Sequence, residues 1–383
     1  MLLLVQQHFA EIFIALFAMV VIADLLYYFL LFSKFAFYKP VKPAHFSQPP
    51  VSIVIATQND AHNLKRSLPI LLTQQYNDYE VLVVSDHPDD DTEMVMAEFL
   101  EQYPNIVKYV NLTSSVTHIK GKKFPLALGI NAAKYEIVLL TEPNCVPVSQ
   151  YWLQNMAKHF DGRKEIVLGY GNYEREAKLS NLLLRFDTMQ NSMQYFSYAL
   201  AKSPCMGAGR NLAYTKKLFL KNNGFSSHYH IMYGEDDLFV NQVATASNCD
   251  VECFGESFVL AHPEYSLASW LKEKRKHNFT RRYYKPRHKF LLGAYDLLMP
   301  LFYICFGLAL YFSLHDFTAL YVIGGLFLLK TGVQYLIFGL SAKKLHESNF
   351  IPFILLYDIL FALLNPLIYI ATKLTIKPVK KWK

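Results

Sequence analysis

Three adjacent carboxylates, Glu235, Asp236 and Asp237, are the strongest chemical feature of the sequence. Neighbouring acids repel one another, so a fold keeps them together where a metal, a base or a cationic ligand is needed. A solvated helix start is the plain alternative, because Asp and Glu favour the first turn of a helix. Apolar segments of membrane length flank the region that contains these acids, and this setting favours chemistry.

The apolar residues are distributed unevenly along the 383-residue chain, which is 52% hydrophobic. A membrane-spanning helix needs about 20 predominantly apolar residues. No small-residue cleavage site follows the first such segment, so we expect an anchor rather than a signal peptide. Asp24 and Lys330 lie inside spans, where ionisable residues are functional hypotheses by default. Asp358 and the Asn365-Pro366 pair make the last segment a candidate for a re-entrant or interfacial helix. The expected spans are residues 12–32, 297–312, 320–340 and 351–371, of which 297–312 is the shortest.

The lysines predict the orientation of the chain in the membrane. Lys34 and Lys39 follow the first span, and Lys343 and Lys344 lie between the last two. The positive-inside rule then places residues of about 40 to 290 in the cytoplasm. The basic tail from Lys373 also favours the cytoplasm, which a fourth complete span would not allow. We therefore expect an integral membrane protein of the bacterial inner membrane whose main domain is cytoplasmic.

Several classes of function are disfavoured. The formal charge of +7 is modest and its basic residues cluster beside membrane segments, so headgroup attraction explains them better than nucleic acid does. The sequence has neither a phosphate-loop lysine motif nor a G-x-G-x-x-G motif. The five cysteines show no metal spacing, and their odd number suits a reducing compartment. His228, His230 and His262 lack further ligands at zinc spacing. A transporter does not fit the large soluble block and the absence of an internal repeat.

Short β-branched runs alternate with helical stretches between residues 51 and 140, which predicts a parallel, doubly wound α/β sheet. In such sheets the ligand lies at the carboxyl ends of the strands. Asn59 and Asp60 follow the first strand, Asp86 the second, and Glu142 and Asn144 the fourth. The expected strands are residues 51–56, 79–84, 106–112 and 136–140.

The alternation becomes irregular after residue 150. We expect a helix at 151–160, a strand at 165–170 and a long helix at 179–200. Gly207 and Gly209 then permit a close backbone approach beside Arg210, although such a pair is more often a tight turn. The expected domains are an anchor at 1–35, a cytoplasmic domain at 45–290, and a membrane region at 291–383 with two or three spans and a basic tail.

With these residues placed, the chain resembles family-2 glycosyltransferases of the GT-A fold, in the membrane-embedded branch that includes cellulose, hyaluronan and poly-N-acetylglucosamine synthases. The resemblance runs from about Pro50 to Phe290. Residues 56–60 match the turn that ends the first strand, Asp86 stands where the family has an Asp pair against the nucleotide base, and Gly121-Lys122-Lys123 resembles a segment near the nucleotide. The resemblance implies these nucleotide-sugar contacts: Asn59, Asp60, Asp86, Lys123 and Glu142.

The family's metal-binding D-x-D motif ends the fourth strand, and this chain has Glu142-Pro143-Asn144 there. A divalent cation at this place neutralises the diphosphate leaving group and takes oxygen ligands. The resemblance therefore implies Mg²⁺ or Mn²⁺ as cofactor with Glu142 and Asn144 as its ligands. The site has one formal charge fewer than the family pattern, and Pro143 stiffens its loop.

Glu235-Asp236 matches the family's E-D motif, in which the Asp is the general base that deprotonates the acceptor hydroxyl. The resemblance implies Asp236 as the catalytic residue, while Asp237 holds the acceptor or tunes its neighbour. Residues 270–277, WLKEKRKH, stand where relatives carry Q-x-x-R-W, with Glu273 in place of Gln. A basic cluster there can face the diphosphate, and an interfacial helix that binds lipid headgroups is the alternative. The expected contacts to acceptor or diphosphate are Arg210, Asp237, Arg275, Lys276 and His277.

The resemblance implies an inverting transferase that moves a sugar from a nucleotide-sugar donor, UDP-linked, to a lipid-linked or polysaccharide acceptor at the cytoplasmic membrane face. The nucleotide sugar, the acceptor and membrane lipids are the expected partners, and nucleic acid is not. A catalytically weak GT-A scaffold that binds nucleotide or assists another synthase is the alternative, suggested by the altered positions. The retained Glu235-Asp236 favours activity.

Overall fold

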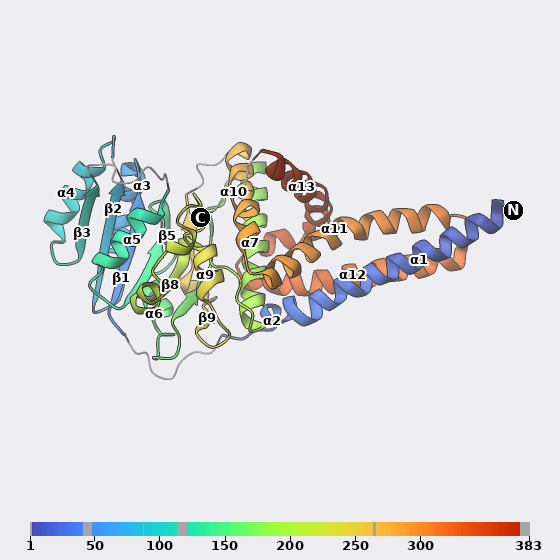
Figure 1. The fold of residues 1–383 in the computed structure, drawn as a ribbon, viewed down its shortest axis with the longest axis horizontal. Coiled ribbons are helices and arrows are strands. Elements are labelled where there is room, and N and C mark those ends of the chain that lie inside the picture. Colours follow the sequence, from blue (N-terminus) through green and yellow to red (C-terminus); the bar gives the residue numbers. More distant parts are fainter. Residues whose placement is uncertain (1, 41–47, 87, 113–120, 263–265, 376–383) are drawn as a thin grey trace. The chain divides into compact units, whose positions relative to one another are not determined.

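The computed structural model describes residues 2–40, 48–86, 88–112, 121–262 and 266–375 (Figure 1). The chain forms two compact units. The helical unit holds the described residues up to Tyr38 and from His277 onward, and the sheet unit runs from Lys39 to Lys276. The division falls within α10, Leu267–Thr280, and so before the expected boundary at residue 290.

The described strands of the sheet unit form a seven-stranded sheet in the order β3-β2-β1-β4-β8-β6-β9 and a three-stranded sheet in the order β5-β10-β7. Neighbours among β3, β2, β1 and β4 are parallel, whereas β8 is antiparallel to both β4 and β6. This confirms a mostly parallel sheet. The bounds are β1 Val51–Thr57, β2 Tyr79–Asp86, β3 Val107–Leu112, β4 Ile137–Thr141, β5 Cys145–Pro147, β6 Ile166–Leu168, β7 Gly171–Tyr173, β8 Leu212–Thr215, β9 Cys249–Val251 and β10 Val259–Ala261.

Helices cover both faces of the parallel strands, which is why these strands read as continuous apolar runs. Ile53 and Ile55 face a core shared with the helices that follow β1 and β2. Val54 faces the other side, where Gly129 brings the next helix so close that a Cβ would lie 2.6 Å from Val54 Cγ1. The helices of this unit are α3 Ala61–Leu71, α4 Thr92–Gln102, α5 Lys123–Ala132, α6 Trp152–Ala157, α7 Leu179–Leu200, α8 Lys216–Lys221 and α9 Asp237–Val243.

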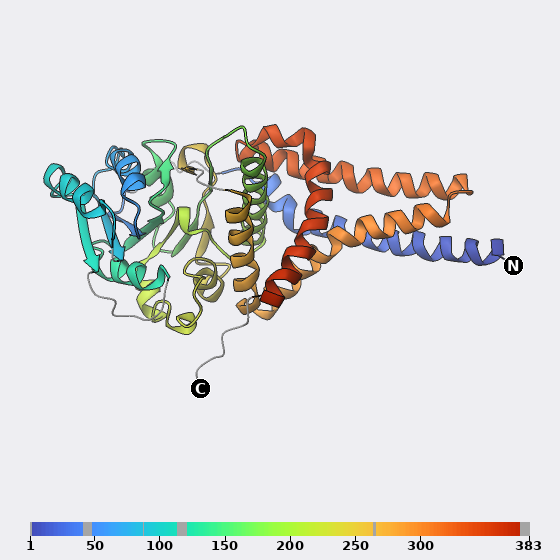
Figure 2. The same cartoon turned by 90° about the horizontal axis from the view of Figure 1, so that it is seen from above.

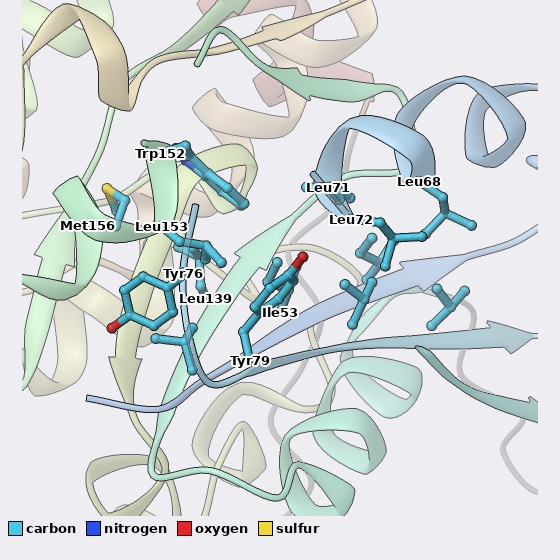
Figure 3. Packing of buried hydrophobic residues seen from close by; sticks show 14 of the residues in the cluster. Ile53, Leu68, Leu71, Leu72, Tyr76, Tyr79, Leu139, Trp152, Leu153 and Met156 are labelled. Atoms are coloured by element: carbon cyan, nitrogen blue, oxygen red, sulfur yellow. The ribbon is translucent and has the colours of Figure 1, made fainter. Parts of the chain in front are cut away.

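The core beside β1 joins this strand to α3, α6 and β4. Figure 3 shows Leu68 and Leu71 of α3 and Trp152 of α6 gathered around Ile53 and Leu139. All five side chains are at most 1% exposed, and complete burial of such a side chain contributes ~1.5–3 kcal/mol. This core holds the ends of β1 and β4, which carry the polar residues of the site.

The helical unit consists of long apolar helices, and α1 packs along α11 (Figure 2). Four helical stretches among the described residues are long and apolar enough to cross a membrane: His8–Ala36, Pro286–Phe312, Phe317–Lys344 and Ser348–Thr375. They identify an integral membrane protein. The elements are α1 Leu2–Tyr27, a π-helical turn Tyr28–Phe32, α2 Ser33–Ala36, α11 Pro286–Phe312, α12 Phe317–Lys344, a 3-10 segment Ser348–Phe353 and α13 Ile354–Thr375.

Two acidic side chains of the helical unit are paired with basic ones. Asp358 accepts a hydrogen bond from Lys330 Nζ at 3.1 Å, and α13 continues as a helix through Pro366. Asp296 pairs with Arg281 at 2.8 Å. Because polar residues occupy the first turns of α11, hydropathy alone shortened this helix to residues 297–312, whereas it begins at Pro286.

Candidate functional site

The strand register brings the carboxyl ends of three strands together. Thr57 of β1 lies opposite Ser85 of β2, and Ile55 lies opposite Thr141 of β4. The residues that follow these strands therefore occupy one edge of the sheet, as the sequence predicted. They are Asn59 and Asp60 after β1, Asp86 at the end of β2, and Glu142 after β4.

Glu142 is the centre of an ion-pair network. Its Oε1 lies 3.1 Å from Lys122 Nζ, and its Oε2 lies 3.1 Å from Arg210 Nε. Burial opposes the charge of this carboxyl, but the two cations outweigh it and lower the pKa of Glu142 to about 2. Glu142 is therefore a permanent carboxylate with a cation at each oxygen.

Asn59 and Asp60 shape the loop between β1 and α3. Asn59 has φ +56, and its Oδ1 accepts the backbone N–H of Asp89 at 2.7 Å. Asp60 Oδ2 accepts the Thr57 hydroxyl at 3.1 Å, and its Oδ1 accepts Asn63 Nδ2 at 3.1 Å. Asp86 is partly buried at the end of β2. These residues are at the expected edge, and their contact with a nucleotide stays a prediction.

The two adjacent lysines at the start of α5 have different environments. Lys123 is 4% exposed, and its Nζ donates to the carbonyls of His228 at 2.7 Å, Ile231 at 2.7 Å and Tyr233 at 2.8 Å. Burial lowers the pKa of Lys123 to about 8, although nearby carboxylates favour its charge. Since all three donors of this ammonium are engaged, Lys122 is the lysine available to a ligand, with its side chain 47% exposed.

The carboxylates at 235–237 lie directly after the segment that Lys123 holds. Asp236 is the N-cap of α9, where its Oδ1 accepts the N–H of Asp237 at 2.7 Å. Asp237 is 2% exposed, and its Oδ1 accepts the N–H of Leu238 at 2.7 Å. Burial, and next the charge of Asp236, raise the pKa of Glu235. Glu235 and Asp236 are both partly exposed, whereas Asp237 is buried, so the first two can reach a substrate.

The turn Gly209–Asn211 connects the base candidate to Glu142. The N–H of Gly209 donates to Asp236 Oδ2 at 2.8 Å, and the next residue, Arg210, holds Glu142. A Cβ at position 209 would lie 3.3 Å from Asp236 Oδ2, so glycine permits this close approach. Arg210 also stacks on the Tyr173 ring, with its Cζ 4.2 Å from the centroid, and donates to the Tyr173 hydroxyl. Asp236 and Glu142 are thereby held by adjacent residues of one turn.

Among the basic residues expected on α10, Lys276 contacts the segment before Glu235. Its Nζ pairs with Glu273 at 2.5 Å and lies 5.3 Å from the centroid of the Tyr233 ring. Lys274 instead pairs with Asp187 of α7 at 2.6 Å. Arg275 is partly buried in the same helix, and His277 belongs to the helical unit. Lys276 is thus brought beside the segment that precedes Glu235.

The geometry does not favour the metal site that the sequence predicted at Glu142 and Asn144. Both Glu142 oxygens face cations, and Asn144 would add only a neutral amide oxygen, whose neighbour is Cys145 Sγ at 3.7 Å. His262, one of the three histidines considered as zinc ligands, pairs with Glu174 at 3.0 Å. Within the ranges that the structure describes, no group of three or more His, Cys, Asp or Glu side chains could hold a metal ion.

Sequence reasoning missed two residues of this site. Lys122 was part of the motif that carried the resemblance, but the lysine chosen from it was Lys123, because adjacent helix positions cannot be ranked without knowing which face is buried. Tyr173 carried no signal, since its strand β7 has three residues and no readable alternation.

Comparisons with known proteins agree with this architecture. Residues 15–375 match the model of glycosyl transferase family 21. The poly-β-1,6-N-acetyl-D-glucosamine synthase of Staphylococcus epidermidis is 25% identical over 126 residues, 33% of this chain and 29% of that protein. Glycosyltransferase AglE of Haloferax volcanii is 25% identical over 178 residues, 46% of this chain and 53% of that protein. The chain thus spans about a third to about half the length of these curated relatives.

A solved structure matches over nearly the whole chain. The mannosyltransferase PcManGT of Pyrobaculum calidifontis, in complex with GDP-Man and Mn²⁺, covers 93% of this chain and 99% of its own, with a TM-score of 0.57 and 18% identity. This likeness shows the fold, a mixed α/β sheet of the GT-A type. The expected resemblance to membrane-embedded GT-A glycosyltransferases is confirmed, and the family that matches is the one numbered 21.

Proposed function

The chain belongs to glycosyl transferase family 21, and we propose that it is an inverting enzyme that moves a sugar from a UDP-linked donor to a lipid-linked or polysaccharide acceptor. One observation carries the proposal: Gly209 holds Asp236 at 2.8 Å, and Arg210 holds Glu142 at 3.1 Å. Adjacent residues thus place a candidate base beside the carboxyl end of β4, where ligands of such sheets bind.

In the proposed mechanism, Asp236 takes the proton of the acceptor hydroxyl as that oxygen attacks the anomeric carbon. The bond between this carbon and the diphosphate oxygen breaks in the same step, and the nucleoside diphosphate leaves with the electron pair. Each Asp236 oxygen accepts one backbone N–H, from Asp237 and from Gly209, which fixes the orientation of the carboxylate. Carboxylate oxygens accept further bonds beyond these, so the acceptor hydroxyl can be bound as well. Burial, and next the charge of Asp236, raise the pKa of Glu235, so Glu235 holds a proton more readily than an ordinary glutamate and is less suited to act as the base.

The acceptor is proposed to be membrane-associated. The chain that carries the sheet unit also has four helical stretches, among the described residues, that are long and apolar enough to cross a membrane. Transfer to a soluble acceptor would not need such attachment to a membrane. The clusters of Lys residues beside these helices support a cytoplasmic catalytic unit at a bacterial inner membrane. A polymer acceptor and a lipid-linked acceptor both satisfy this arrangement.

The experiment uses the full-length protein in detergent to identify the nucleotide-sugar donor and to test Asp236 as the general base. Released nucleoside diphosphate is measured with UDP- and GDP-linked sugars and membrane lipid extract as acceptor source. Asp236→Asn is expected to lower transfer by about 10² to 10⁴-fold, the usual contribution of a general base, with nucleotide affinity retained. Asp78→Asn is the matched control, because Asp78 is exposed in the turn before β2, at the opposite edge of the sheet. Full transfer by Asp236→Asn would show that Asp236 is not the general base. If the parent protein transfers no sugar from any donor, the alternative of a catalytically weak scaffold is favoured.

A further inference from the structure

The position of the family's metal-binding motif is occupied by an ion-pair triad in this chain. Lys122 Nζ and Arg210 Nε each lie 3.1 Å from a different oxygen of Glu142. The three side chains come from three elements: the loop before α5, the turn before β8 and the end of β4. Arg210 is fixed a second time through Tyr173, so the triad is a built feature of the sheet edge.

The charge of this triad is suited to an anion. Two cations and one carboxylate leave one net positive charge. By comparison, a divalent cation held by two carboxylates forms a group with no net charge. Arg210 donates from Nε to Glu142 and from Nη2 to Tyr173 and brings its fixed charge to this edge. Lys122 is an exposed point charge, and charge-assisted hydrogen bonds to phosphate are strong. The triad can therefore face a diphosphate without a further positive ion.

A divalent ion at Glu142 meets two obstacles. Oxygen ligands of Mg²⁺ or Ca²⁺ lie at about 2.0–2.6 Å, so the ion would lie within a few ångströms of Lys122 and Arg210 and be repelled by both. It would also have to replace one of the two bonds to Glu142, and Asn144 offers no charge in compensation. The residues present do not fit the ion that this position binds in related sequences.

We propose that Lys122 and Arg210, held by Glu142, bind the diphosphate of the donor and its leaving group in place of a divalent cation. This inference rests on the proposed function, because it requires a nucleotide-sugar donor at this edge. Lys122 and Arg210 are then substrate-contacting residues, and Glu142 is a positioning residue that acts through them.

The test measures binding rather than turnover. Affinities of UDP, GDP, ADP and CDP for the full-length protein in detergent are determined by calorimetry in EDTA, and again with Mg²⁺ or Mn²⁺. We expect at least one nucleotide to bind in EDTA with an affinity within about threefold of that with metal, since hydrogen bonds to charged groups rather than metal coordination hold the phosphates. Binding that needs the metal would overturn this inference and leave the proposed function standing. No binding of any nucleotide under either condition would overturn both.

Two substitutions separate the roles. Lys122→Gln should weaken nucleotide binding in EDTA by about tenfold or more, the worth of one charge-assisted bond. Lys217→Gln is the matched control, because Lys217 is exposed in the first turn of α8 and its backbone N–H donates to Glu136, near the amino end of β4. Glu142→Gln should leave EDTA binding intact or tighter, since it removes a competing negative charge. If Lys122→Gln binds like the control, or if Glu142→Gln abolishes binding that metal had supported, the triad does not replace the ion.

Discussion

Replacing Lys123 by methionine tests how the acidic segment is held. The Lys123 ammonium donates to the carbonyls of His228, Ile231 and Tyr233, and it is nearly completely buried. Methionine keeps the length and most of the volume of the side chain but has no donor. The substitution therefore leaves three carbonyls without their partner just before Glu235.

The expected loss of stability follows from two opposing effects. A hydrogen bond from a charged donor contributes ~1.5–3 kcal/mol, and Lys123 makes three of them. Burying the ammonium costs about 3 kcal/mol at ~1.4 kcal/mol per pKa unit, since its pKa falls from 10.5 to about 8. The net loss is ~1.5–6 kcal/mol, a range that includes the cost of breaking a buried charge interaction.

The assay compares parent, Lys123→Met and the control Lys217→Met by thermal unfolding and by hydrogen exchange in detergent. Faster exchange of the amides at 228–236 is expected only in Lys123→Met, together with a lower unfolding temperature. Because the folded pKa of Lys123 lies below its ordinary value, the unfolded chain binds more protons between about pH 8 and 10.5, so parental stability rises over that window relative to the variant. Unchanged exchange at 228–236 would refute the anchoring role.

Two further predictions concern buried charges elsewhere. His159 bonds Asp250 at 3.0 Å and Glu252 at 2.8 Å; burial opposes its charge, but these bonds outweigh it and raise its pKa. The stability that protonated His159 contributes is present below about pH 6.5 and is lost as pH rises through the folded pKa. The unfolding temperature of the His159→Phe variant should therefore fall less with rising pH above pH 6.5 than that of the parent. An identical pH dependence of the two proteins would contradict this prediction. Lys330→Met should cost about 3–5 kcal/mol by leaving the Asp358 carboxylate without its cation, although the Tyr303 hydroxyl still donates to it. Adding Asp358→Asn should recover most of this loss in thermal unfolding, and equal instability of the double variant would refute the pairing.

The parallel half of the sheet was predictable because its strands are buried on both faces. Val51–Thr57 and Tyr79–Asp86 are continuous apolar runs followed by polar turns, and the helix Leu179–Leu200 has the predicted bounds. The small sheet was not predicted, because β5, β7 and β10 have three residues each and no alternation to read. The antiparallel insertion of β8 depends on pairing with strands far away in sequence.

The site was predictable in its members but less so in their contacts. Polar residues at strand ends identified Asp60 and Glu142, since the edge of a parallel sheet is set by topology. The cations that neutralise Glu142 come from positions 122 and 210, and such long-range pairs leave no periodic signal. For the same reason Lys330 had no identifiable partner until Asp358 was found 28 residues away.

The segment Gly121-Lys122-Lys123 links the two halves of the proposed reaction. Gly121 has φ +139, and a Cβ there would lie 2.7 Å from the carbonyl oxygen of Met232, so only glycine allows this approach. Lys123 holds the same segment through three carbonyls, while Lys122 turns to Glu142. One short stretch therefore fixes the acids that would activate the acceptor and carries a cation that would hold the diphosphate. Because the two sides share three consecutive residues, we predict that Lys123→Met lowers nucleotide affinity as well as transfer, and unchanged nucleotide affinity in this variant would contradict the link.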